Sequence, residues 1–171
     1  MKDFTPVKQE LIAALDAGRA AARAFVETLP PDLPVHADSD WTARDLIIHL
    51  TALEADTITA MQRAASGDNF AVDLRGQMDA TALYELRRRD HADRNWDELL
   101  REWARIRDQL RGLVLAFPGD QMGATFSTPF FVDYDLAGVA GACIAHEQRH
   151  LAEMRAALEG QLPAEEPEGG E

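Results

Sequence analysis

The sequence has little cysteine, no long apolar run and few basic residues. Cys143 is the one cysteine among 171 residues, which excludes an intrachain disulfide and favours a reducing compartment. No stretch approaches the roughly 18 to 20 consecutive apolar residues of a membrane-spanning helix. The first residues, Met1 to Phe4, also lack the apolar segment of a signal peptide. We therefore expect a cytoplasmic protein with no membrane partner.

Basic residues are outnumbered by acidic ones. The chain has 17 Lys and Arg against 30 Asp and Glu, a formal net charge of −13. Such a chain repels a phosphate backbone unless its basic residues gather on one face. The dense basic cluster Arg87-Arg88-Arg89 is flanked by Glu85 and Asp90. Nucleic acid is therefore not an expected partner.

Strand-like alternation is almost missing, whereas apolar residues recur at helical spacings of three, four and seven. Four segments follow this pattern, each long enough for a helix that buries one face. The expected helices span residues 5–29, 42–67, 81–117 and 133–160. The third is expected to break near residues 93–95, and residues 68–79 are expected to form a functional or mobile loop.

Local signals mark where these helices begin and end. Thr42 and Asp45 have the spacing of a capping box, with Asp in the usual Glu or Gln place. Asn95 or Asp93 is a candidate cap after the expected break, and Asp133 is the expected cap of the last helix. Gly160 is the expected C-terminal stop of that helix.

Four amphipathic helices bury their apolar faces most simply by packing together. The sequence therefore predicts an all-α protein, an up-and-down four-helix bundle with medium-length connections, over residues 1–160. Residues 161–171 are acidic and rich in proline and glycine, and are expected to be a disordered tail. Binding sites in such bundles are built from side chains on facing helices.

Three histidines of the expected helices are candidate metal ligands. His146 and His150 are four residues apart, so both rings lie on one helical face and can reach one metal ion. His49, in the second helix, is a candidate third ligand. Three imidazoles with an open position suit Zn, Ni or Fe(II). The alternative is a boundary pair hydrogen-bonded to carboxylates or water.

The segment from Trp41 to Leu50, W-T-A-R-D-L-I-I-H-L, followed about a hundred residues later by His146 and His150, resembles the DinB-like family over roughly residues 5–158. The resemblance implies a four-helix bundle that holds a divalent metal on His49, His146 and His150, and a two-fold homodimer. Characterised relatives include thiol-dependent S-transferases and a mycothiol-dependent maleylpyruvate isomerase. It thus implies a metal-dependent transferase or isomerase with a small-molecule substrate and a low-molecular-weight thiol cofactor.

Two other functions are compatible with the sequence. The bundle could be a non-catalytic metal-binding or stress-related protein, since no second catalytic constellation is visible. His146, Glu147 and His150 also match H-E-x-x-H, in which the glutamate is the general base of a zinc hydrolase. That class needs a third ligand downstream, and only a short tail follows. Glu147 remains the leading candidate for a catalytic base.

Further residues near the histidines have both a structural and a functional interpretation. Glu153 replaces the glutamine that many relatives have three residues after the last histidine, and would orient a ligand imidazole. Asp56 lies on nearly the same helical face as His49, where a solvated carboxylate is the usual interpretation. Cys143 precedes His146 by one turn, where a small buried apolar residue is expected rather than a ligand.

The remaining candidates lie in expected connections. His36 and His91 fall in or near such segments and are expected to be exposed to solvent. Phe126, Phe130 and Phe131 precede the last helix and could form the wall of a substrate pocket at the mouth of the bundle.

Overall fold

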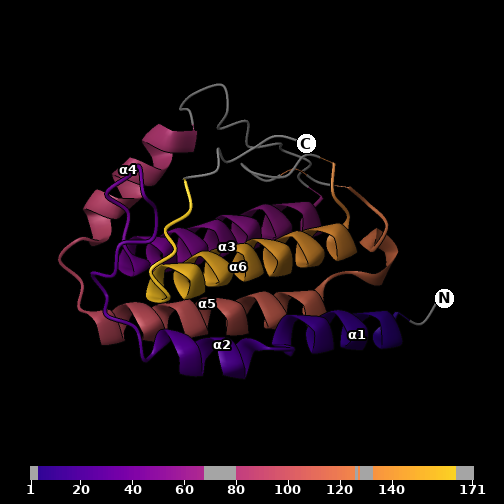
Figure 1. Ribbon diagram of the computed structural model, residues 1–171. Coiled ribbons are helices and arrows are strands. Elements are labelled where there is room, and N and C mark those ends of the chain that lie inside the picture. Colours follow the sequence, from indigo (N-terminus) through magenta and orange to yellow (C-terminus); the bar gives the residue numbers. More distant parts are fainter. Residues whose placement is uncertain (1–3, 68–79, 126, 128–132, 165–171) are drawn as a thin grey trace.

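A computed structural model describes residues 4–67, 80–125, 127 and 133–164 of the chain. The elements are α1 (Thr5–Asp16), α2 (Arg19–Val26), α3 (Ala43–Ala65), α4 (Ala80–His91), α5 (Trp96–Ala116), the 3-10 helix η2 (Gly119–Gln121) and α6 (Leu136–Leu158). The row formed by α1 and α2 packs alongside α5, α6 and α3, and α4 lies at one end of the bundle (Figure 1). The prediction of an all-α four-helix bundle is therefore confirmed.

The first expected helix is divided into two. The prediction of one helix over residues 5–29 is wrong, because Gly18 adopts a left-handed backbone conformation with φ of +78° between α1 and α2. Glycine adopts this conformation at little cost because it has no Cβ. The break allows α2 to begin at Arg19, whose side chain is buried in the bundle.

Replacing Gly18 by alanine should lower the free energy of unfolding by about 1 to 2 kcal/mol, because the left-handed conformation is strained for a residue with a Cβ. Gly112→Ala is the matched control, since Gly112 lies inside α5 and an added Cβ would meet nothing within 4 Å. That substitution should stabilise by up to about 1 kcal/mol through helix propensity. Urea unfolding measures both values. An increase in stability for Gly18→Ala would contradict the strained turn.

The helix starts follow the expected capping chemistry with one exception. In α3 the Thr42 backbone N–H donates to the Asp45 carboxylate at 2.9 Å, and the Thr42 hydroxyl accepts from the Asp45 N–H, as a capping box requires. Asn95 caps α5 by accepting from the Glu98 N–H at 2.9 Å. For α6 the prediction of Asp133 is wrong. Asp135 accepts from the Gly138 N–H at 2.8 Å, because the helix begins two residues later than expected.

The sequence predicts helices that alternate in direction, and one pair of helices departs from this order. α3 and α5 run parallel: Arg44, at the start of α3, donates to the Arg94 carbonyl just before α5. About three turns further along both helices, Glu54 of α3 pairs with Arg107 of α5. The segment between the two helices, which includes α4, must therefore return the chain to the end of the bundle where α3 began. Successive up-and-down helices would have needed only a short connection there.

The core consists of two apolar clusters with a layer of buried charges between them. On α5, Trp103 belongs to the first cluster and Leu110 to the second, and Arg107 lies between the two positions. This layer is formed by two arginines and two glutamates, none more than 8% exposed: Arg19, Glu54, Arg107 and Glu147. It places ionic contacts close to the helical turn that carries His146.

The end of the bundle after α6 follows the expected stop. Gly160 has φ of +78°, and the Gln161 N–H donates to the Ala156 carbonyl at 2.8 Å. The Pro163 carbonyl accepts from the Ala37 N–H at 2.9 Å, so this part of the tail is attached to the segment before α3. Disorder of the tail beyond residue 164 stays a prediction, and the expected loop at 68–79 lies outside the described residues. No helix in the described part of the chain combines the length and apolarity needed to cross a bilayer.

Candidate metal centre

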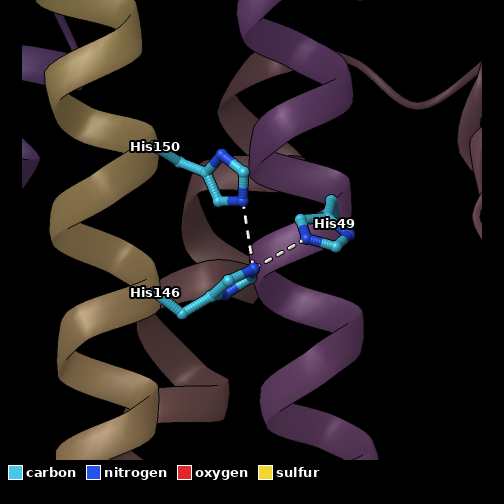
Figure 2. A group of neighbouring side chains, drawn as sticks. All are labelled: His49, His146 and His150. Atoms are coloured by element: carbon cyan, nitrogen blue, oxygen red, sulfur yellow. Dashed lines mark hydrogen bonds between the residues drawn. The ribbon is translucent and has the colours of Figure 1, made fainter. Parts of the chain in front are cut away.

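The structure brings together the three histidines singled out from the sequence. His49 of α3 faces His146 and His150, which lie one turn apart on α6 (Figure 2). The Nε2 atom of His146 lies 2.9 Å from Nε2 of His49 and 3.0 Å from Nε2 of His150. His49 and His150 are buried and His146 is partly exposed. The cluster therefore lies between two helices with one ring open to solvent.

Neighbouring aromatic rings fix the position of His49. The Tyr84 ring of α4 contacts the His49 ring edge-on, with ring centroids 4.4 Å apart. The ring of Trp41, from the segment before α3, has its centroid 5.7 Å from that of His49. Both aromatic side chains are buried. Sequence reasoning did not find Tyr84, because no local pattern indicates that α4 packs on the start of α3. These rings limit how far the imidazole can turn.

The hydrogen-bonding chemistry of the cluster fits a cation. The His150 Nδ1 atom lies 2.6 Å from Glu153 Oε2, so Nδ1 carries the proton and Nε2 of the neutral ring has a lone pair. His146 Nε2 faces both other Nε2 atoms, and one N–H can donate to only one of them. A divalent ion would accept lone pairs from all three atoms. The residues present therefore fit an ion such as Zn, Ni or Fe(II).

Glu153 orients a histidine of the cluster, as the sequence predicts. Burial alone would raise the pKa of Glu153, but its hydrogen bond with His150 and the nearby His36 lower the pKa below its ordinary value. The side chain is thus a carboxylate at neutral pH and accepts the Nδ1 proton of His150. A glutamine at this position would have offered one carbonyl oxygen without the charge.

A guanidinium group lies at the edge of the cluster. Nη2 of Arg149 is 3.2 Å from Nε2 of His150, and Nε of Arg149 is 4.0 Å from a Glu153 oxygen. Because Arg149 is half-exposed, it adds a positive charge on the solvent side of the three rings. The charge favours anions near the cluster, in contrast to the net charge of the whole chain.

Glu147 lies in the buried charge layer. Its carboxylate pairs with Arg19 of α2 and accepts from Nη2 of Arg107 at 3.1 Å. Two guanidinium groups thus compensate the charge of the buried carboxylate. The role of Glu147 as a general base stays a prediction, and these ion pairs weigh against it.

Two further candidates lie away from the three rings. Cys143 is 1% exposed in the second apolar cluster, and burial raises the pKa of its thiol to about 12, so the thiol is neutral. This agrees with the structural interpretation of that residue. Asp56 pairs with Arg87 of α4, and burial raises the pKa of Asp56 above its ordinary value. The ion pair connects α4 to α3.

The prediction that His36 is exposed is wrong. His36 is only 5% exposed, because the segment before α3 folds back through a hydrogen bond from Val35 N–H to the Trp41 carbonyl. Its ring lies beside Glu153, a residue 117 positions away in the sequence. His91, at the end of α4, is half-buried rather than exposed. The expected pocket wall of Phe126, Phe130 and Phe131 lies outside the described residues.

Comparison with known proteins agrees with this geometry. The family model of the DinB superfamily matches residues 14–154. An uncharacterised protein from Escherichia coli UTI89 has a similar fold, with a TM-score of 0.67 and 16% identity, over 90% of this chain and 93% of that one. No curated protein matches the sequence. Because the family match extends over most of the helical bundle and includes His49, His146 and His150, the chain belongs to the DinB superfamily.

Proposed function

We propose that this protein is a divalent-metal-dependent enzyme that uses a low-molecular-weight thiol in a transferase or isomerase reaction on a small-molecule substrate. His49, His146 and His150 are the proposed ligands. The observation that carries the proposal is the convergence of three imidazole nitrogens, all within 4.8 Å of one another. Imidazole suits Zn, Ni and Fe(II), so any of these ions is compatible with the donors.

The number of protein ligands favours a catalytic ion over a structural one. Structural zinc sites are closed by four protein ligands, whereas catalytic sites use three and keep a position for water or substrate. Among the residues that the structure describes, no fourth Cys, His, Asp or Glu joins the three histidines. When bound, the ion would lower the pKa of a thiol or water in the open position.

The surrounding side chains support thiolate binding. Arg149 places a positive charge within 3.2 Å of His150, and a cation nearby favours the thiolate over the thiol. Trp41 and Tyr84 pack on the His49 ring, which is 3% exposed, so solvent does not reach the cluster from that side. The open side is therefore the one next to His146 and Arg149, where a small molecule would enter.

Cobalt substitution tests this proposal. Protein loaded with Co(II) should develop a thiolate-to-metal charge-transfer band when titrated with a small thiol, because an open position allows direct sulfur ligation. The band should be lost in His150→Ala and retained in His91→Ala, which changes a half-buried histidine of α4. Titration with several low-molecular-weight thiols measures thiol binding. Adding an electrophilic reporter to each mixture then measures transfer of the thiol.

The same titration tests a second candidate, a non-catalytic metal-binding protein. The ion pairs of Glu147 with Arg19 and Arg107 favour this candidate, because they engage the glutamate of H-E-x-x-H that would otherwise act as the base. A Co(II) protein that gains thermal stability but binds no thiol would overturn the thiol-dependent proposal and support this one. The ion pairs weigh equally against a zinc hydrolase. The homodimer and the cytoplasmic location stay predictions.

A further inference from the structure

A second histidine–carboxylate contact lies behind the three-histidine cluster. Nε2 of His36 is 3.4 Å from Glu153 Oε2, the same oxygen that lies 2.6 Å from Nδ1 of His150. On the other side of the His36 ring, Nδ1 is 3.4 Å from the Ser39 hydroxyl. Ser39, His36 and Glu153 thus form a chain of polar contacts that reaches the proposed metal ligand His150.

The direction of each hydrogen bond follows from the donors available. Glu153 Oε2 lies within hydrogen-bond distance of both rings, and a carboxylate oxygen accepts, so it accepts from both His36 Nε2–H and His150 Nδ1–H. A neutral His36 with its proton on Nε2 has a lone pair on Nδ1, which accepts from the Ser39 hydroxyl. One tautomer therefore satisfies both ring nitrogens of His36.

The backbone on both sides of His36 is held by hydrogen bonds. Val35 N–H donates to the Trp41 carbonyl at 3.0 Å, and Ala37 N–H donates to the Pro163 carbonyl at 2.9 Å. The His36 ring lies 6.4 Å from that of Trp41, and the side chain is 4% exposed. The imidazole is thus held against α6 by bonds to the segment before α3 and to the tail, independently of any ion.

We propose that His36 is a positioning residue of the metal centre, acting through Glu153 on His150. By holding Glu153 Oε2, His36 keeps the carboxylate on the Nδ1 proton of His150 and leaves the Nε2 lone pair directed at His49 and His146. Without this contact the flexible glutamate can turn towards Arg149, whose Nε lies 4.0 Å from Oε1. The inference rests on the proposed metal binding and adds a residue from the loop before α3.

Matched substitutions separate the hydrogen bond from packing. His36→Phe keeps a ring of similar size but removes the donor, whereas His36→Gln retains an amide N–H near the position of Nε2. We expect His36→Phe to weaken zinc binding about three- to tenfold. A partner that orients a ligand directly contributes about ten- to hundredfold, and His36 acts on the ligand only through Glu153. His36→Gln and the control His91→Phe should stay within about twofold of the unsubstituted protein. Competition with a chromophoric chelator measures the affinity.

A double substitution tests whether His36 acts through Glu153. Glu153→Ala alone should weaken zinc binding about ten- to hundredfold. Adding His36→Phe to Glu153→Ala should then have no further effect, because the residue that transmits the contact is gone. An unchanged affinity in His36→Phe, or a loss that adds fully to that of Glu153→Ala, would overturn the inference.

The tautomer of His36 can be measured in the unsubstituted protein, so the inference remains testable where a variant does not fold. Long-range 15N–1H spectra should show the proton on Nε2 of His36 and on Nδ1 of His150 in the zinc-bound protein. A proton on Nδ1 of His36 instead would contradict the proposed direction. If the unsubstituted protein binds no zinc, the proposed function and this inference fail together. If it binds zinc with the other tautomer, the inference alone fails.

Discussion

Replacing any one of His49, His146 and His150 by alanine should lower the affinity for zinc at least about tenfold, because an alkyl group cannot replace an imidazole ligand. The three nitrogens lie within 4.8 Å of one another on two facing helices, so each can contribute to a single ion. Two remaining imidazoles form a weaker site that water must complete. The expected stoichiometry of the unsubstituted protein is about one ion per chain.

Elemental analysis of protein purified without a metal-affinity tag measures the content, and chelator competition measures the affinity. His91→Ala is the control, since His91 lies at the end of α4 outside the cluster. Circular dichroism of each variant separates loss of the site from loss of the fold. Unchanged metal content in all three ligand variants would show that the assigned site is wrong.

The helices were predictable because their determinants are local. Apolar spacing, the Thr42–Asp45 capping box and Asn95 lie within a few residues of the features they define. The break at Gly18 was missed because an isolated glycine within a helical pattern is tolerated, at a cost of about 1 kcal/mol, and need not end the helix. The parallel direction of α3 and α5 depends on how a long connection is routed, and no local spacing encodes that.

The candidate site was predictable to the extent that its residues share one helix. His146, His150 and Glu153 follow helical spacing, so their common face can be read from the sequence. His36 is brought to Glu153 from 117 residues away, and its burial depends on a fold-back of the preceding segment. The partners of Glu147 are equally distant, with Arg19 separated from it by 128 residues. Tertiary packing alone brings these groups together.

Arg107 is the centre of the buried charge layer. Its Nε lies 3.0 and 3.2 Å from the two oxygens of Glu54, Nη1 donates to the Leu15 carbonyl at 2.8 Å, and Nη2 donates to Glu147 at 3.1 Å. The group is 2% exposed. These contacts connect α1, α3, α5 and α6, so one side chain bridges all four rows of the bundle.

Arg19 completes the layer from α2. Its guanidinium lies over the Trp103 ring at 3.8 Å from the centroid and donates to the Trp103 carbonyl at 2.8 Å. Burial, together with repulsion from Arg107, lowers the pKa of Arg19 to about 9, so the group is still protonated at neutral pH. Two cations and two carboxylates therefore balance one another in the interior.

Arg107→Met should destabilise the protein by about 3 to 5 kcal/mol, because it leaves the buried carboxylate of Glu54 uncompensated and weakens the pairing of Glu147. Replacing both partners, in Arg107→Met with Glu54→Met, should recover much of the loss, since no unpaired charge then remains between them. The control is Arg105→Met, two residues away on α5. Arg105 is 51% exposed and pairs with Glu102, so its loss should change stability little. Urea unfolding at neutral pH measures all three variants, and a double variant less stable than Arg107→Met would show that packing, rather than charge balance, dominates this layer.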